Sequence, residues 1–240
     1  MITVILNCYK RPQYLQEQIE AIRAQTISTE DIWIWSNKPE NQNQQDLSHL
    51  GVKTIMCNHN FKFHGRFALG LLAKTKYVAF FDDDTIPGNK WFESCINTIN
   101  QGYNGILGTT GVLLGGKYYT PNTKVGWNGG GNDQPQEVDL VGHAWFMEKN
   151  HLRYLWYEDP VSWDNGEDMQ LSYLAQKYGN IKTYVPPHPQ SDHSLWGSLP
   201  TRGKQYGDDN NASWRVNNHA YLRDTIVKEQ IKRGWKIVDQ

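Results

Sequence analysis

The sequence lacks most of the features that mark secreted, membrane-spanning or nucleic-acid-binding proteins. Its 240 residues contain only three cysteines, and each lies in an apolar or strand-like stretch, as is typical of reduced, buried thiols. No apolar run reaches the length of a membrane-spanning helix, and the first residues show a strand pattern without a charged leader region. The formal net charge is only −1, which indicates neither nucleic acid nor anionic lipid as a partner. These absences favour a cytoplasmic protein that reaches its partners through a local site.

What the chain does have is a regular alternation of strands and helices. A chain of this length can form one large α/β domain that buries about 70 to 75% of its unfolded surface. Short apolar strands are predicted near residues 2–6, 32–35, 52–56 and 77–81, and amphipathic helices near 12–22, 67–73 and 91–99. Strands at 106–114, within 138–148 and at 181–185 follow, with a glycine-rich loop at 126–131 and a helix that ends at Gly179. This βα pattern predicts a mostly parallel central sheet.

The C-terminal part is less regular. After the proline-rich residues 186–189 the sequence predicts irregular structure to about residue 213, and then a basic amphipathic helix over 221–231. Such a helix suits a membrane surface, but the near-neutral net charge favours a cap on the core. We therefore expect a single domain over residues 1–240, divided into segments 1–115, 116–185 and 186–240.

The densest chemistry lies in three consecutive aspartates, Asp82, Asp83 and Asp84, directly after the apolar strand 77–81. Residues two apart in an extended chain point the same way, so Asp82 and Asp84 can converge where the strand ends. Their repulsion is relieved by a proton or a cation, and hard oxygen ligands select Mg²⁺ or Mn²⁺. The triplet therefore predicts a metal or phosphate site, with a solvated acidic turn as the alternative.

The order of several short motifs resembles a known enzyme family. They are Asn7-Cys8-Tyr9-Lys10-Arg11-Pro12, Trp35-Ser36-Asn37-Lys38, Arg66 ahead of a helix, the aspartate triplet, and Gly166-Glu167-Asp168 at the start of a helix. Together, over residues 2–185, they resemble the nucleotide-sugar glycosyltransferases of the GT-A fold. The chain is similar to the broad family 2 and, in its triplet and Trp-Ser-Asn element, to the exostosin-like family 64.

The resemblance implies a Rossmann-like α/β/α sandwich. Its first half, residues 1–115, would bind a nucleoside diphosphate sugar, and residues 116–185 would receive an acceptor hydroxyl, for example on a glycan during polysaccharide biosynthesis. Residues 186–240 would form a C-terminal loop and a capping helix.

For the metal, the resemblance implies that the triplet acts as a DXD motif. Asp84 becomes the principal ligand of Mn²⁺ or Mg²⁺, and Asp82 shares the ion or contacts the ribose. Asp83 points to the other side of the strand, so a ligand, sugar-binding or structural role stays open. A third ligand would come from a C-terminal histidine, either His188 or His193.

For the donor, the resemblance places Tyr9 and Arg11 beside the nucleotide base and ribose. Asn37 ends the second strand, and its amide matches the hydrogen-bonding edge of uracil, so UDP is the expected nucleotide. Arg66 would pair with the nucleotide or with Asp82. Arg202 and Lys204 can neutralise the diphosphate if their loop closes over it.

For catalysis, the resemblance places Glu167 and Asp168 beside the acceptor. Asp168 is the expected general base if the anomeric centre is inverted. If configuration is retained, Asp168 would instead stabilise the oxocarbenium-like state or position the sugar. Glu167 would bind acceptor hydroxyls. The alternative is that both acids only complement the dipole at the start of a helix. Trp163, close by, is a candidate platform for the face of a sugar ring.

The sequence leaves two further classes of function open. The string from Asp82 to Thr85 resembles the D-x-D-x-T nucleophile loop of haloacid-dehalogenase phosphatases, but its threonine comes one position early and it follows the fourth strand instead of the first. A non-catalytic sugar-binding or nucleotide-binding module is the other alternative.

Overall fold

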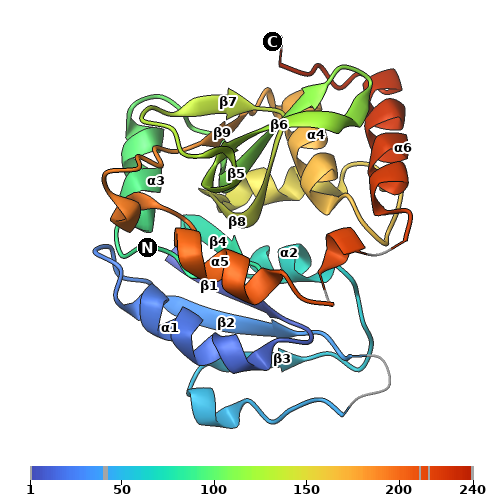
Figure 1. The fold of residues 1–240 in the computed structure, drawn as a ribbon. Coiled ribbons are helices and arrows are strands. Elements are labelled where there is room, and N and C mark those ends of the chain that lie inside the picture. The colour runs from blue at the N-terminus through green and yellow to red at the C-terminus, as the bar shows by residue number, and fades with distance from the viewer. Residues whose placement is uncertain (1, 40–42, 211, 216, 239–240) are drawn as a thin grey trace.

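The structure is a computed structural model that describes residues 2–39, 43–210, 212–215 and 217–238, and its centre is one nine-stranded sheet (Figure 1). The strands are β1 (Ile2–Cys8), β2 (Asp31–Ser36), β3 (Lys53–Met56), β4 (Tyr77–Phe81), β5 (Ile106–Gly115), β6 (Tyr118–Gly126), β7 (Gln136–Val138), β8 (Leu140–Glu148) and β9 (Thr183–Val185). The α-helices are α1 (Leu15–Arg23), α2 (Gly65–Gly70), α3 (Trp91–Asn100), α4 (Glu167–Gly179), α5 (Pro200–Gly207) and α6 (His219–Lys232). Short 3-10 helices are η1 (Pro12–Tyr14), η2 (Ser48–Leu50), η3 (Trp127–Gly129), η4 (Lys149–Trp156), η5 (His193–Leu195) and η6 (Ser213–Arg215).

The sheet is parallel in its first half and mixed in its second. Strands β3, β2, β1 and β4 run parallel in that order, as the βα pattern predicts. Strand β8 then lies antiparallel between β4 and β5, and β6 forms an antiparallel hairpin with β5. Strand β9 is parallel to β5, and β7 is antiparallel to β9. The expected α/β class is confirmed, but the parallel arrangement is limited mainly to the first half.

Helices cover both faces of the sheet because successive strand residues alternate between two apolar cores. In β4, Val78 and Phe80 face one core, and Tyr77, Ala79 and Phe81 face the other. Helices α2, α4 and α6 pack on the first core, and α1 and α3 on the second. This alternation produces the expected α/β/α layers, with α1 and α4 visible on the two halves of the molecule (Figure 1).

Three elements differ from the prediction. Residues 118–126 form strand β6, which is joined to β5 by a turn at Gly116, where φ is +72°. The segment after residue 186 contains helix α5, which begins with Pro200 in its first turn. The glycine-rich stretch, expected to be a loop, contains η3 with Trp127 buried.

Helix α5 lies across the front of the first half, near α1 and the end of β4 (Figure 1). The ring of Tyr206 stacks on that of Tyr14 at 3.8 Å, and its hydroxyl donates to Glu17 Oε2 at 2.6 Å. The backbone at Gly207 is so close to the carboxylate of Asp84 that an added Cβ would clash with it. The C-terminal segment therefore covers the aspartate triplet. Among the described residues, no helix combines the length and apolar character needed to cross a membrane.

Candidate active site

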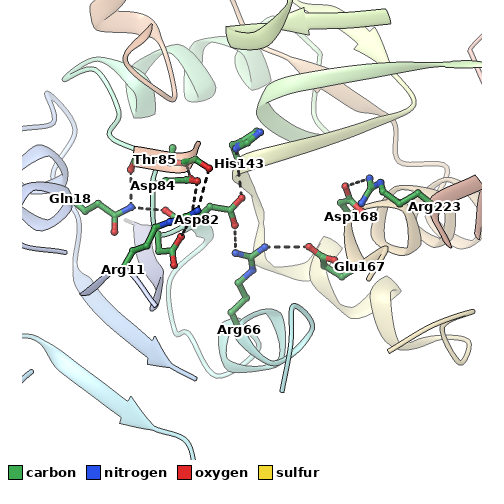
Figure 2. A network of polar contacts seen from close by, with 12 residues as sticks. Arg11, Gln18, Arg66, Asp82, Asp84, Thr85, His143, Glu167, Asp168 and Arg223 are labelled. Atoms are coloured by element: carbon green, nitrogen blue, oxygen red, sulfur yellow. Dashed lines mark hydrogen bonds and ion pairs between the residues drawn. The ribbon is translucent and has the colours of Figure 1, made fainter. Parts of the chain in front are cut away.

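The aspartate triplet is held in a tight turn after β4. The backbone N–H of Asp82 donates to His143 O at 2.9 Å, and the side-chain amide of Gln18 donates to the carbonyls of Asp82 and Thr85 at 2.6 and 2.8 Å (Figure 2). Helix α1 supplies Gln18 and strand β8 supplies His143, so the turn is fixed from two sides.

Asp82, Asp84 and His143 form a group that can hold a metal ion. One ligand atom from each residue lies within 4.8 Å of the others, and His143 Nδ1 is 3.9 Å from Asp82 Oδ2. All three residues are partly exposed, so an ion has access. Two carboxylates and an imidazole suit Mn²⁺ or Mg²⁺ with open positions for a ligand. The residues therefore fit a divalent metal.

A bulge in β8 turns His143 toward the triplet. Gly108 of β5 pairs with Trp145 and Thr110 pairs with Gly142, so β8 carries one more residue than β5 over this interval. His143 takes up the extra length with a φ of +66°, which is uncommon for a residue other than glycine. The sequence offers only a weak signal for this, a glycine followed by histidine inside an apolar strand.

The structure does not bring His188 or His193 to this group. His188 is fully buried, with its ring nitrogens 2.9 Å from Thr109 Oγ1 and 2.8 Å from Pro186 O. Burial lowers the pKa of His188 to about 4. The His193 ring packs on Trp196 at 4.7 Å. Neither histidine lies with Asp82 and Asp84, and the third member of the possible metal-binding group is His143, which sequence reasoning missed.

Asp83 is not part of the possible metal group and pairs with Arg11. The Arg11 Nη1 atom is 2.8 Å from Asp83 Oδ1 and 3.1 Å from Asp84 Oδ2, and its Nη2 is 2.6 Å from Asp209 Oδ1. Burial and the charge of Asp84 raise the pKa of Asp83 to about 7. Burial and the charge of Asp82 raise that of Asp84 to about 6. One guanidinium thus balances acids from β4 and from the covering segment after α5.

Arg66 joins the triplet to the acidic pair at the start of α4. It is 1% exposed, its Nη1 pairs with Asp82 Oδ1, and its Nη2 is 3.3 Å from Glu167 Oε1 (Figure 2). The guanidinium also lies over the rings of Trp145 and Phe67, at 4.7 and 5.1 Å from their centroids. Arg66 was expected near Asp82, and the structure adds its second partner, Glu167.

The two acids at the start of α4 are both buried, but their partners differ. Gly166, with φ of +90°, turns the chain into the helix. Burial and the charge of Asp168 raise the pKa of Glu167 to about 7. Asp168 Oδ2 is 2.7 Å from Arg223 Nη2, and its Oδ1 accepts from the Met169 backbone N–H at 2.9 Å. Arg223 comes from α6, and no local sequence pattern indicates that it reaches α4.

Residues 3–154 match the model of glycosyl transferase family 2. The chain belongs to this family. A search of curated proteins finds no match. Among solved structures, the fold is similar to the crystal structure of TarS from S. aureus, with a TM-score of 0.54 and 15% sequence identity. That likeness covers 78% of this chain and 35% of TarS, so the chain spans about a third of the length of that protein.

Membership of this family favours glycosyl transfer over both the phosphatase and the binding-module alternatives. In this family 2 chain, Asp82, Asp84 and His143 lie inside the matched range. Glu167, Asp168 and the helix that carries Arg223 lie beyond it. The evidence that Glu167 and Asp168 belong to the site therefore comes from the tertiary structure and the motif order, and not from the family match.

The remaining predicted residues surround the site in different ways. Tyr9 lines a pocket at the exits of β1 and β2, together with Ser36 and Gln44. The Asn37 side chain is buried by three contacts: its carbonyl accepts from Trp35 Nε1 and the Phe61 N–H, at 3.2 and 3.1 Å, and its amide donates to Lys62 O at 3.0 Å. Asn37 therefore fixes the loop after β3, and it also lines the pocket beside Tyr9.

The basic candidates Arg202 and Lys204 and the aromatic candidate Trp163 lie at the margins of the site. Arg202, on α5, pairs with Glu17 at 3.0 Å, and Lys204 lies on the same helix. Trp163 is 57% exposed and its ring centroid is 5.1 Å from that of His64. It is placed two residues before Asn165, on the approach to α4.

Proposed function

We propose that this glycosyltransferase moves a sugar from a nucleoside diphosphate sugar, with UDP as the nucleotide, to a hydroxyl of a glycan or another acceptor. The observation that carries the proposal is the Arg66 bridge, which links a metal-binding group at Asp82 to the acidic pair at Glu167. Sugar transfer needs charge compensation at the leaving diphosphate and a base at the acceptor. The bridge supports a site in which the metal-binding group and the acidic pair lie side by side.

Mg²⁺ or Mn²⁺ held by Asp82, Asp84 and His143 would neutralise the charge that develops on the diphosphate. Asp84 is the principal ligand in this proposal, because Asp82 divides its carboxylate between the group and Arg66. Arg11 holds Asp83 and Asp84 in place, and Lys204 on α5 supplies further positive charge near the diphosphate.

Asp168 takes the proton from the acceptor hydroxyl as its oxygen bonds to the anomeric carbon and the bond from that carbon to the diphosphate breaks. This assignment corresponds to inversion of the anomeric centre. Glu167 binds acceptor hydroxyls, and Trp163 stacks on a sugar ring of the acceptor.

The pocket at the exits of β1 and β2 supports a planar base beside Tyr9. Asn43, Gln44 and Gln45 line it with amides that offer both donors and acceptors, which suits the edge of uracil. Gln44 already donates to Ser36 O at 2.8 Å, so its position is fixed. These amides share the role expected of Asn37.

The first test concerns donor and metal. We expect UDP to bind with Mn²⁺ more tightly than without it, and Asp84→Asn to remove most of that difference while the protein stays folded. Isothermal calorimetry with UDP, with and without Mn²⁺, measures this. Asp133→Asn, an exposed acid in the loop before β7, is the matched control. Equal metal dependence in Asp84→Asn and the parent would reject the metal assignment.

The second test concerns the base. Asp168→Asn keeps the shape and one acceptor oxygen but removes the basicity, so transfer should fall by roughly a hundredfold or more while UDP affinity is retained. UDP release from a panel of UDP-sugars, with simple glycosides as acceptors, measures transfer. Parental turnover in Asp168→Asn would reduce Asp168 to a helix-start acid and move the search to Asp139 or Asp164.

A further inference from the structure

Arg223 connects α6 and β6 to the residues at the start of α4. It projects from α6, is 7% exposed, and donates from Nη1 to Asn165 Oδ1 at 2.8 Å and from Nη2 to Asp168 Oδ2 at 2.7 Å. Its guanidinium lies 4.4 Å from the centroid of the Tyr119 ring on β6. The side chain is therefore fixed by two hydrogen bonds and one ring contact, and Figure 2 shows it end-on to Asp168.

These contacts lie on both sides of the turn that leads into α4. Asn165 and Asp168 lie on either side of Gly166 and Glu167, so one planar guanidinium sets the spacing across the turn. The Asn165 side chain also contacts His219 Nδ1, at the start of α6, at 3.4 Å. Gly166 has no room for a side chain because a Cβ there would meet Ile226 of α6. Helix α6 thus shapes this turn from outside.

Arg223 also supplies the cation that pairs with Asp168. A buried carboxylate must either take up a proton or pair with a cation. Arg66 reaches Glu167 at 3.3 Å and is shared with Asp82, whereas Arg223 pairs with Asp168 at 2.7 Å. With Oδ2 held by Arg223 and Oδ1 held by the Met169 N–H, Asp168 has one orientation.

We propose that Arg223 is a positioning residue for sugar transfer: it holds Asp168 in one orientation toward the acceptor. This inference rests on the proposed role of Asp168. It assigns a function in the reaction to the C-terminal helix, which lies outside the range matched by the family model. Arg223 itself does not touch substrate in this proposal.

The test is a double-mutant cycle between Arg223→Gln and Asp168→Asn. If Arg223 acts through Asp168, Arg223→Gln alone should lower kcat by roughly a hundredfold, but by less than about threefold when Asp168→Asn is already present. The KM for a UDP-sugar with Mn²⁺ should stay within about twofold, because the donor group lies in the other half of the site. Arg223→Lys keeps the charge but cannot span both partners, so its kcat should be intermediate.

The control is Arg233→Gln. Arg233 follows α6 directly and pairs with Glu229 at 3.1 Å, at the end of the helix remote from Asn165. It should leave kcat unchanged. If Arg223→Gln fails to fold, Arg223→Lys and the double variant, in which no buried carboxylate is left unpaired, still complete the comparison.

The outcomes distinguish the positioning role of Arg223 from the role of Asp168 as the base. Equal losses in both backgrounds, or parental kcat in Arg223→Gln, would overturn the positioning role while leaving Asp168 as the base. Parental kcat in Asp168→Asn would overturn the proposed base and the inference together. A loss confined to KM would also count against Arg223 as a positioning residue.

Discussion

At the scale of single residues, three arginines control the acids of the site. Among the described residues, Arg11 pairs with Asp83 and Asp84. Arg66 pairs with Asp82 and Glu167. Arg223 pairs with Asp168. Each arginine is at least nine-tenths buried, where removal of one partner leaves a charge without compensation. Single substitutions at these positions should therefore have specific and separable effects.

The histidine ligand gives a direct residue-scale prediction. His143→Ala should weaken Mn²⁺ binding about tenfold or more, because the group keeps only its two carboxylates. His188→Ala should lower the melting temperature through loss of packing and of the Thr109 contact, with Mn²⁺ affinity of the folded protein unchanged. Calorimetric titration with Mn²⁺ and thermal melting measure the two effects. The reverse pattern would restore His188 as the ligand.

Glu167 gives a prediction about pH. Its pKa is raised from 4.5 to about 7, mainly by burial, so its proton favours the folded state below pH 4.5 and this contribution is lost as the pH rises through 7. Relative to the parent, Glu167→Gln should gain free energy of unfolding between pH 5 and 8, by up to roughly 3 kcal/mol.

Urea denaturation in pH steps measures that difference, with the exposed Glu30→Gln as a control. The sign follows from the raised pKa, because a lowered pKa would reverse it. A difference that stays constant from pH 5 to pH 8 would contradict the assignment.

At the scale of elements, most predicted strands and helices are confirmed, and the exceptions have local causes. Strand β6 was missed because residues 118–126 carry exposed polar side chains on an outer hairpin. Helix α5 was missed because it is only eight residues long and mostly polar, and it depends on contacts such as the Tyr206–Tyr14 stack.

Helix α5 also supports a prediction of its own. Gly207→Ala would push a methyl group into the carboxylate of Asp84, so it should reduce Mn²⁺-dependent UDP binding without unfolding the protein. Gly102→Ala, where an added Cβ meets nothing, is a control for adding a methyl group away from the site, although Gly102 is left-handed and Gly207 is not. UDP calorimetry with Mn²⁺ measures the effect. Unchanged binding would mean that α5 does not sit on the triplet when ligand is bound.

At the scale of the whole molecule, Arg66 ties the parallel half of the sheet to α4. Arg66→Met keeps much of the stem packing but leaves Asp82 and Glu167 without a cation, which should cost about 3 to 5 kcal/mol of unfolding free energy. Added Mn²⁺ should restore part of this by compensating Asp82.

Urea denaturation with and without Mn²⁺ checks that prediction, and Arg153→Met, on an exposed part of η4, is the control. If Arg66→Met were as stable as the parent, the bridge would not hold the halves together.

The sequence by itself determined the apolar strands, the α/β layers and the position of the acids. Alternation of Val78 and Phe80 with Tyr77, Ala79 and Phe81 sets the faces of β4, and the break in that apolar run places the triplet at the strand end. These features are local, so they can be read from neighbouring residues.

Only the tertiary structure decided which distant residues complete the site. His143 reaches Asp82 because β8 runs antiparallel to β4 and carries a bulge, and Arg223 reaches Asp168 because α6 folds back over α4. Both depend on strand order and helix packing between segments 55 or more residues apart, and no local periodicity records them. Asn37 shows the same limit, since its hydrogen bonds with Trp35, Phe61 and Lys62 depend on the tertiary structure and not on its residue type.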